Sequence, residues 1–274
     1  MIIRLITAVL LKILKAITSP ILPSPLLRLY RNIVIYPQFK DTLEKNKSLQ
    51  NKHSGQRCFI VGNGPSLSQL DLNKLDSETT FVLNHFYHYR NPQKFIPSYY
   101  CYIAPDFPKY YPHIASYLGK NKKTNCLFSI YQKPLIDNQR LFDSQKVFYW
   151  FFSDIFRWYD SKVNIDITKP VLGGNFIAFA VIITAIYMGF KKIYLIGFDH
   201  NWKSTPDDVL EDRFYHRLPI NPQKWVYYYD LHKDVFKPYK LIKTAAKNNH
   251  ATIFNATPGS LLDVFPRVNY NHLF

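Results

Sequence analysis

Short apolar runs alternate with amphipathic stretches along most of the chain. The runs are rich in β-branched and aromatic residues, which indicates strands, and they lie at residues 57–61, 79–83, 99–103, 125–130, 146–151, 192–196 and 251–254. Of the helical stretches between them, residues 175–188 are apolar all round and are therefore expected to be buried. This alternation predicts an α/β fold with a single Rossmann-like domain, whose mostly parallel sheet is covered by helices on both faces.

The first 20 residues, MIIRLITAVLLKILKAITSP, have a different pattern. Their longest uncharged run, residues 5–11, is far short of the ~20 apolar residues that a spanning helix needs. At about 100° per residue, Arg4, Lys12 and Lys15 fall within roughly 80° of one another on an otherwise apolar helix. Such a basic stripe is typical of a helix that lies in the membrane interface, although a helix packed on its own domain would show it too.

The domain organisation follows from this change of pattern. A second short amphipathic piece, in which Arg28 and Arg31 are interleaved with leucines and a tyrosine, follows the prolines at 20–25. We therefore expect N-terminal amphipathic membrane-surface helices in residues 1–38, a linker or exposed helix in 39–56 and a catalytic domain in 57–274. The polar stretch around residues 207–212 is typical of a solvated loop or a mobile lid.

Charge and cysteine content narrow the partners. The formal net charge is +16, and residues 1–57, with ten Lys and Arg against two Asp and Glu, hold +8 of it. A basic chain suits nucleic acid, anionic lipid or a phosphorylated substrate. No zinc finger, helix-turn-helix pattern, Arg-rich tract or aromatic RNA-reading motif is present, which argues against nucleic acid. Cys58, Cys101 and Cys126 lie in apolar runs without CxxC spacing, so we expect reduced core residues and a cytosolic compartment.

Candidate ligand-binding residues follow the predicted strands, because parallel α/β sheets bind ligands at the carboxyl ends of their strands. The sequence GNGPSL at 62–67 offers backbone amides and the Ser66 hydroxyl to a ribose or phosphate, although an ordinary tight turn capped by Ser66 remains an alternative. It lacks the third glycine of the dinucleotide fingerprint and is not a Walker A loop. The candidates after the predicted strands are Gly62, Asn63, Gly64, Ser66, Asn84, Asp106, Gly197, Asp199 and His200.

Further candidates are weaker when each is taken alone. Gly173 and Gly174 precede the buried helix, whose positive end could face an anion, but a glycine pair there is often structural. His232 precedes an amphipathic helix, and Ser260 caps a turn in TPGSLL, where the default interpretation is structural. The sequence contains no Asp-x-Asp motif, which disfavours metal-dependent sugar transfer, and we expect neither a metal nor another cofactor.

Taken together, these motifs resemble those of the bacterial lipooligosaccharide sialyltransferases. GNGPSL, LNHFYHY at 83–89, GFKKIYLIGFD at 189–199, His232 and TPGSLL match that family in order and approximate spacing over about residues 57–265. The chain is also similar to the motility-associated flagellin glycosyltransferases and the proteins related to 6-hydroxymethylpterin diphosphokinase (MptE-like), whose glycine-pair-plus-helix element is closer to VLGGNFIA at 171–178.

The sialyltransferase resemblance implies a variant glycosyltransferase-A-like fold and metal-independent transfer from a cytidine monophosphate (CMP) sugar whose sugar is a nonulosonic acid. It implies that Asn63 contacts the nucleotide, that Asn84 lies at the donor and that His232 is the general base, with His200 as the rival candidate. The chain departs from the family at three places. Where the family has an asparagine before a proline, this chain has Ala104 before Pro105, and Asp106 follows them. Gly173, Gly174 and Asn175 replace a Ser-Gly pair, and His200, Asn201 and Trp202 stand where tyrosines are expected.

The expected acceptor is a lipid-linked or surface glycan at the cytoplasmic face of the bacterial inner membrane, since a lipid-linked acceptor requires proximity to the bilayer. Three alternatives stay open: pterin diphosphoryl transfer with Mg²⁺ and ATP, a different nucleotide-sugar transferase on the same fold, and an inactive membrane-bound scaffold. A homo-oligomer is also left open.

Overall fold

The computed structural model describes residues 28–89, 95–104, 106–119, 123–139, 142, 146–154, 162–172, 176–200, 210–214, 216–219 and 235–274. Within them, one seven-stranded sheet has the order β11-β8-β1-β2-β3-β4-β5, and every neighbouring pair is parallel. The strands are β1 (Arg57–Val61), β2 (Thr79–Leu83), β3 (Tyr99–Tyr102), β4 (Asn125–Ser129), β5 (Val147–Trp150), β8 (Lys192–Ile196) and β11 (Thr252–Asn255). The predicted α/β class with a parallel, Rossmann-like sheet is confirmed, and strand bounds differ from the predictions by at most one residue at each end.

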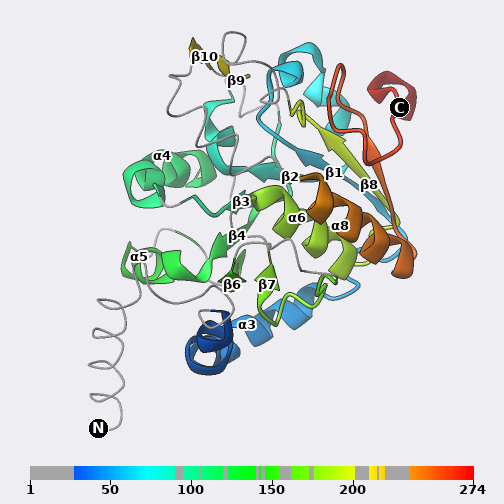
Figure 1. Cartoon of the computed structure of the whole chain (residues 1–274). Helices are drawn as coiled ribbons and strands as arrows, with labels where there is room; N and C mark the ends of the chain where they lie inside the picture. Colours follow the sequence, from blue (N-terminus) through cyan, green and yellow to red (C-terminus); the bar gives the residue numbers. More distant parts are fainter. Residues whose placement is uncertain are drawn as a thin grey trace, which may run out of the picture.

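Helices cover both faces of the sheet. Figure 1 shows α6 (Ile177–Tyr187) and α8 (Phe236–Asn248) side by side over one face, and α6 contacts β1, β2 and β3. The other face is covered by α4 (Phe107–Gly119), α5 (Lys133–Gln139) and several short 3₁₀ turns. Each face has its own hydrophobic core, which is why the strands are apolar on both sides.

Helix α6 is buried along its whole length, as its apolar sequence predicts. The side chain of Thr184 is hydrogen-bonded inside the core. The Thr184 hydroxyl donates to the Ala180 carbonyl at 2.7 Å and accepts from the Trp150 indole at 2.9 Å. Because the hydroxyl both donates and accepts a hydrogen bond, its burial does not carry the free-energy cost of an unsatisfied polar group.

The segment 39–56, expected to be a linker or an exposed helix, is helical in α3 (Lys40–Glu44) and in the 3₁₀ helix Lys45–Leu49. Leu43, Asn46 and Leu49 are fully buried. The Asn46 amide donates to the carbonyls of Tyr149 and Ile167, both at 2.8 Å. This part of the segment therefore covers the free edge of β5, where unpaired backbone groups would otherwise be exposed.

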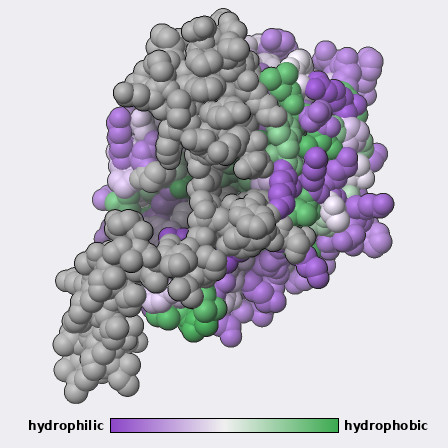
Figure 2. Space-filling model, viewed as in Figure 1, coloured by the Kyte–Doolittle hydropathy of each residue, from purple (hydrophilic) through white to green (hydrophobic). Residues whose placement is uncertain are grey.

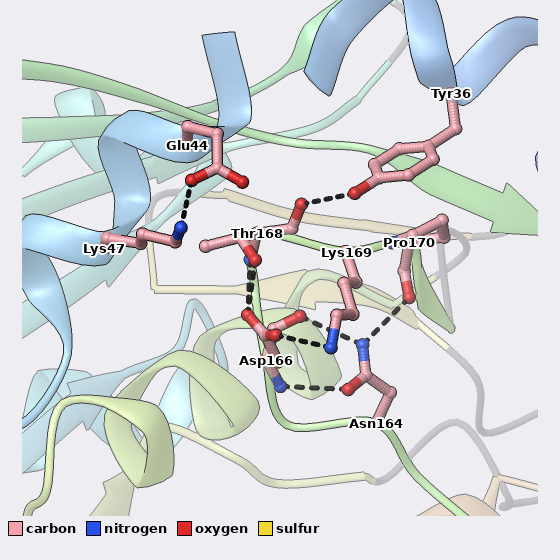
Figure 3. A network of polar contacts seen from close by, with 8 residues as sticks. All are labelled: Tyr36, Glu44, Lys47, Asn164, Asp166, Thr168, Lys169 and Pro170. Atoms are coloured by element: carbon pink, nitrogen blue, oxygen red, sulfur yellow. Dashed lines mark hydrogen bonds and ion pairs between the residues drawn. The ribbon is translucent and has the colours of Figure 1, made fainter. Parts of the chain in front are cut away.

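A polar network also links this N-terminal part to the loop at 164–170 (Figure 3). The Tyr36 hydroxyl donates to the Thr168 carbonyl at 3.0 Å, and the Thr168 hydroxyl donates to Asp166 Oδ1 at 2.6 Å. Burial disfavours the charged Asp166 carboxylate, but bonds from Thr168 and Lys169 more than offset it, so the pKa of Asp166 is lowered. The network therefore keeps Asp166 ionised and the loop docked.

Smaller elements complete the described fold. Strands β6 (Phe152–Asp154) and β7 (Val171–Leu172) form a parallel pair, and β9 (Leu210–Arg213) and β10 (His216–Pro219) form an antiparallel pair. The last residues of the polar stretch interpreted as a loop or lid, 210–212, therefore belong to strand β9. In the described residues no helix is long and apolar enough to cross a membrane. The predicted membrane-surface helix at 1–20 lies outside the described residues.

Candidate active site

The loops that follow β1 and β8 meet at the carboxyl edge of the sheet. The Gly62 amide donates to the Ile196 carbonyl at 2.8 Å, and the Gly64 amide donates to the Gly197 carbonyl at 2.9 Å. Ser66 donates two hydrogen bonds to the Asp199 carboxylate: the Ser66 amide donates to Oδ1 at 3.0 Å, and the Ser66 hydroxyl donates to Oδ2 at 2.8 Å. The structure therefore brings five of the predicted site residues together.

The glycines in these loops are required by close packing. A Cβ at Gly62 would lie 2.4 Å from the Gly197 carbonyl oxygen, and a Cβ at Gly64 would lie 1.7 Å from Asp199 Oδ2. Gly197 has φ +69°, a conformation that favours glycine. The amides of Gly62 and Gly64, expected to be available to a ligand, are already bonded within the protein. In the structure these two glycines allow the loops to approach each other.

Asn63 lies between these packed glycines and has one unused group. Its amide nitrogen donates to the Leu83 carbonyl at 2.9 Å, and its backbone carbonyl accepts from the Phe214 amide at 3.1 Å. The side-chain Oδ1 is buried and has no partner among the described residues. A buried acceptor without a donor costs about 1–3 kcal/mol, so this atom is suited to a donor from a ligand or a water.

Asn84 begins the turn after β2 in a left-handed conformation, with φ 42°. Asparagine tolerates this region better than most residues. Its Oδ1 accepts from the Ile103 amide at 3.3 Å, and its carbonyl accepts from the Tyr100 hydroxyl. Asn84 therefore joins the ends of β2 and β3 and positions the residues that follow it.

Asp106 lies just beyond β3, at the start of α4. The Tyr102 hydroxyl donates to Asp106 Oδ1 at 2.6 Å, and His85 Nε2 lies 3.7 Å from Oδ2. Burial, followed by the bond to Asp106, raises the pKa of Tyr102. The Tyr102 hydroxyl therefore remains protonated and donates to the carboxylate.

His200 follows Asp199 with φ 56°. Its Nε2 lies 3.2 Å from the hydroxyl of Tyr239, in α8. Burial raises the pKa of the fully buried Tyr239, so the hydroxyl keeps its proton and can donate it to this nitrogen. The structure thus holds His200 beside the packed loops with one ring nitrogen directed at α8.

Ser260 is almost fully buried, with 1% of its surface exposed. Its hydroxyl donates to the Phe198 carbonyl at 2.6 Å and accepts from the Asn255 amide at 2.9 Å and the Leu262 amide at 3.1 Å. Thr257 adds a bond from the Phe198 amide at 3.0 Å. In the structure Ser260 holds the loop after β8 in place, and contact with a substrate remains a prediction.

The remaining predicted site residues lie outside the described part of the chain: Gly173, Gly174, Asn175, Asn201, Trp202 and His232. Within the described part, no group of three or more His, Cys, Asp or Glu side chains could hold a metal ion. Cys58, Cys101 and Cys126 are buried and free, which confirms their predicted place in the core, and burial raises the pKa of each thiol.

One cavity lies away from the predicted site residues. It has a volume of about 580 Å³ and lies beside α3, α5 and β5, from which Val147 and Tyr149 line it. Two lysines, Lys45 and Lys133, and two aspartates, Asp41 and Asp137, are among its lining residues. None of the predicted site residues lines this cavity, so it is separate from the site described above.

No family model matches the sequence, and no curated protein matches it. Among solved structures, the chain is similar to the MAf glycosyltransferase from Magnetospirillum magneticum AMB-1, with 14% identity and a TM-score of 0.47 over 87% of this chain and 39% of that one. It is also similar to the sialyltransferase CstII from Campylobacter jejuni in complex with CMP, with 17% identity and a TM-score of 0.46 over 80% of this chain and 86% of that one. CstII with the substrate analogue CMP-3FNeuAc gives 20% identity and a TM-score of 0.44 over 79% and 87%. The chain is thus structurally similar, at low sequence identity, to two glycosyltransferases, and the likeness concerns the fold.

Proposed function

We propose that this protein is a glycosyltransferase that moves a nonulosonic acid from a CMP-sugar to a hydroxyl of a cell-surface glycan or glycolipid precursor. In the proposed reaction the acceptor oxygen displaces CMP directly, without a divalent metal. The observation that carries the proposal is the set of motif residues that meet at the carboxyl edge of the sheet. Asn63, Asn84 and Asp199 come from three different strand ends. The sequence resemblance implies a nucleotide-sugar site for Asn63 and Asn84, and Asp199 is a candidate from its position after a strand.

The unpaired Oδ1 of Asn63 supports a ligand at this place. CMP carries hydroxyl and amino donors that could pair with a buried amide oxygen. The absence of an Asp-x-Asp motif from the sequence supports transfer without a metal. The sequence-based assignment of the general base to His232, with His200 as its rival, remains a prediction.

We also propose that the protein acts at the cytoplasmic face of the bacterial inner membrane. The basic stripe in residues 1–20 supports this, and so does the exposure of Leu29 and Ile33, residues that are 53% and 64% exposed. Figure 2 shows an apolar patch at the lower edge of the molecule, where Figure 1 places the first described helical residues. Exposed apolar residues beside basic ones suit an anionic lipid surface.

A thermal-shift panel tests the function and separates it from the alternatives. CMP should raise the melting temperature of the protein in the presence of EDTA, because a ligand that binds only the folded state stabilises it. Selective stabilisation by ATP with Mg²⁺ would favour diphosphoryl transfer instead. Stabilisation by another nucleotide would indicate a different donor, and no response to any nucleotide would favour a scaffold.

A further inference from the structure

A cluster of aromatic and titratable side chains lies next to Asn84, and the function proposed above does not use it. The cluster consists of His85 and Tyr87 after β2, Tyr102 in β3, and Asp106 and Tyr110 at the start of α4. The two nitrogens of His85 face different partners: Nε2 lies 3.7 Å from Asp106 Oδ2, and Nδ1 lies 3.2 Å from the Tyr87 hydroxyl. Three potential proton carriers therefore lie in a row: Tyr87 is within hydrogen-bond distance of His85, and Asp106 is within ion-pair distance of its other ring nitrogen.

The packing fixes the orientation of the His85 ring. Tyr102 and Tyr110 contact it edge-on, with centroid distances of 5.6 Å and 4.9 Å. The bond from Tyr102 holds Asp106 in turn, and a carboxylate facing Nε2 favours the tautomer with its proton there. The Nδ1 lone pair is then directed at the proton of Tyr87.

The chain is accessible to a substrate at both ends. The side chains of His85 and Asp106 are 23% and 42% exposed, and Tyr87 is half-buried. The other titratable groups nearby flank the cluster: His88 and His113 contact the Tyr87 ring, and Lys109 lies 5.0 Å from the centre of the Tyr110 ring. When protonated, these flanking groups carry positive charge and therefore disfavour a positive charge on His85. The carboxylate of Asp106 favours that charge.

We propose that Tyr87, His85 and Asp106 form a proton relay that deprotonates the acceptor hydroxyl, an inference that rests on the proposed glycosyl transfer. As the acceptor oxygen bonds to the anomeric carbon, its proton passes to the Tyr87 oxygen, and the Tyr87 proton passes to His85 Nδ1. The bond from the anomeric carbon to the phosphate oxygen breaks, and CMP leaves with one additional negative charge. The imidazolium, stabilised by Asp106, carries the matching positive charge.

In this relay Tyr87 is the catalytic residue that touches the acceptor, His85 receives the proton and Asp106 is a positioning residue. The assignment differs from the sequence-based choice of His232 or His200. It uses groups whose mutual distances the structure gives, whereas His200 has one nitrogen directed at the buried Tyr239.

Steady-state transfer to a glycan acceptor tests the relay, with Tyr110→Phe as the matched control. Tyr87→Phe and His85→Gln should lower kcat by about 10²–10⁴-fold, as expected for loss of general base catalysis, while the affinity for CMP measured by calorimetry stays near that of the wild type. Tyr110→Phe also removes a hydroxyl from the cluster but should keep near-normal kcat. Equal kinetics for Tyr87→Phe and Tyr110→Phe would overturn the relay, as would loss of turnover only in His232→Ala or His200→Ala.

A second readout does not depend on turnover. In Asp106→Asn the NMR titration of the His85 ring should have its midpoint at a lower pH than in the wild type, and the acidic limb of kcat should move the same way, because the carboxylate stabilises the imidazolium. An unchanged midpoint would refute the role of Asp106. If the wild type transfers no sugar, the proposed function fails, and an unshifted His85 titration would show separately that the relay geometry fails.

Discussion

Replacement of Gly64 by alanine tests the packing at the candidate site. The added Cβ would lie 1.7 Å from Asp199 Oδ2 and 2.8 Å from the Gly197 carbonyl oxygen. The Asp199 side chain must therefore rotate away, which breaks its two bonds with Ser66. Overpacking costs about 1–3 kcal/mol, and a hydrogen bond to a charged group contributes about 1.5–3 kcal/mol. We expect Gly64→Ala to lower the free energy of unfolding by about 2–5 kcal/mol.

Gly119→Ala is the matched control, because a Cβ at this last residue of α4 meets nothing within 4 Å. Alanine at an unhindered helical position should stabilise the protein by about 0.5–1 kcal/mol. Thermal and urea unfolding followed by circular dichroism measure both variants. For a chain of this size the loss in Gly64→Ala corresponds to a fall in Tm of roughly 5–15 °C.

A double-mutant cycle identifies the cause of this loss. Asp199→Ala removes the obstructing carboxylate, so Gly64→Ala should cost about 0.5–3 kcal/mol less in that background than in the wild type. The remaining cost comes from the Gly197 carbonyl. Equal costs in the two backgrounds, or a melting temperature of Gly64→Ala equal to that of Gly119→Ala, would refute the proposed contact between the two loops.

Three further outcomes test other parts of the structure. Burial lowers the pKa of His53 from 6.5, so its contribution to stability should be fully present above about pH 6.5 and should fall as the pH drops below that value. His53→Gln should therefore reduce the difference in Tm between about pH 5 and about pH 8. An unchanged difference would show that His53 is not the source of this pH dependence. Asn46→Ala should cost about 1–3 kcal/mol in urea unfolding, because the Tyr149 carbonyl at the sheet edge and the Ile167 carbonyl in the loop lose their donor. The exposed Ser48→Ala should stay within about 0.5 kcal/mol of the wild type, and equal effects would argue against edge protection. The triple replacement of Arg4, Lys12 and Lys15 by glutamate should reduce co-sedimentation with anionic liposomes, and undiminished binding would remove the membrane proposal.

The strands and α6 could be predicted from the sequence because their apolar patterns are local. The contacts that shape the candidate site are not local: Gly64 meets Asp199, and Ser260 bonds to Phe198. A glycine that suits a phosphate and a glycine that allows two loops to pack look alike in a sequence. Only the distance to the partner loop distinguishes them.

Three other features could not be predicted from residue type alone. The segment 39–56 is mostly polar, so the buried face formed by Leu43, Asn46 and Leu49 was not evident, although the three residues are three apart, a spacing that could have indicated one helical face. The motif LNHFYHY directed attention to Asn84, whereas two of the groups that contact His85, Tyr102 and Asp106, come from β3 and the turn before α4. The polar stretch at 207–212 suggested a solvated loop or a lid, whereas residues 210–212 belong to strand β9, which pairs with β10.

Calorimetric titration of the full chain with CMP in EDTA tests the central claim most directly. The account predicts that EDTA does not affect the binding of CMP. It also predicts weaker binding in Asn63→Ala, because that variant loses the buried Oδ1, which has no donor among the described residues. ATP in the same buffer should bind more weakly than CMP. Strict dependence on Mg²⁺, or tighter binding of ATP than of CMP, would contradict the account.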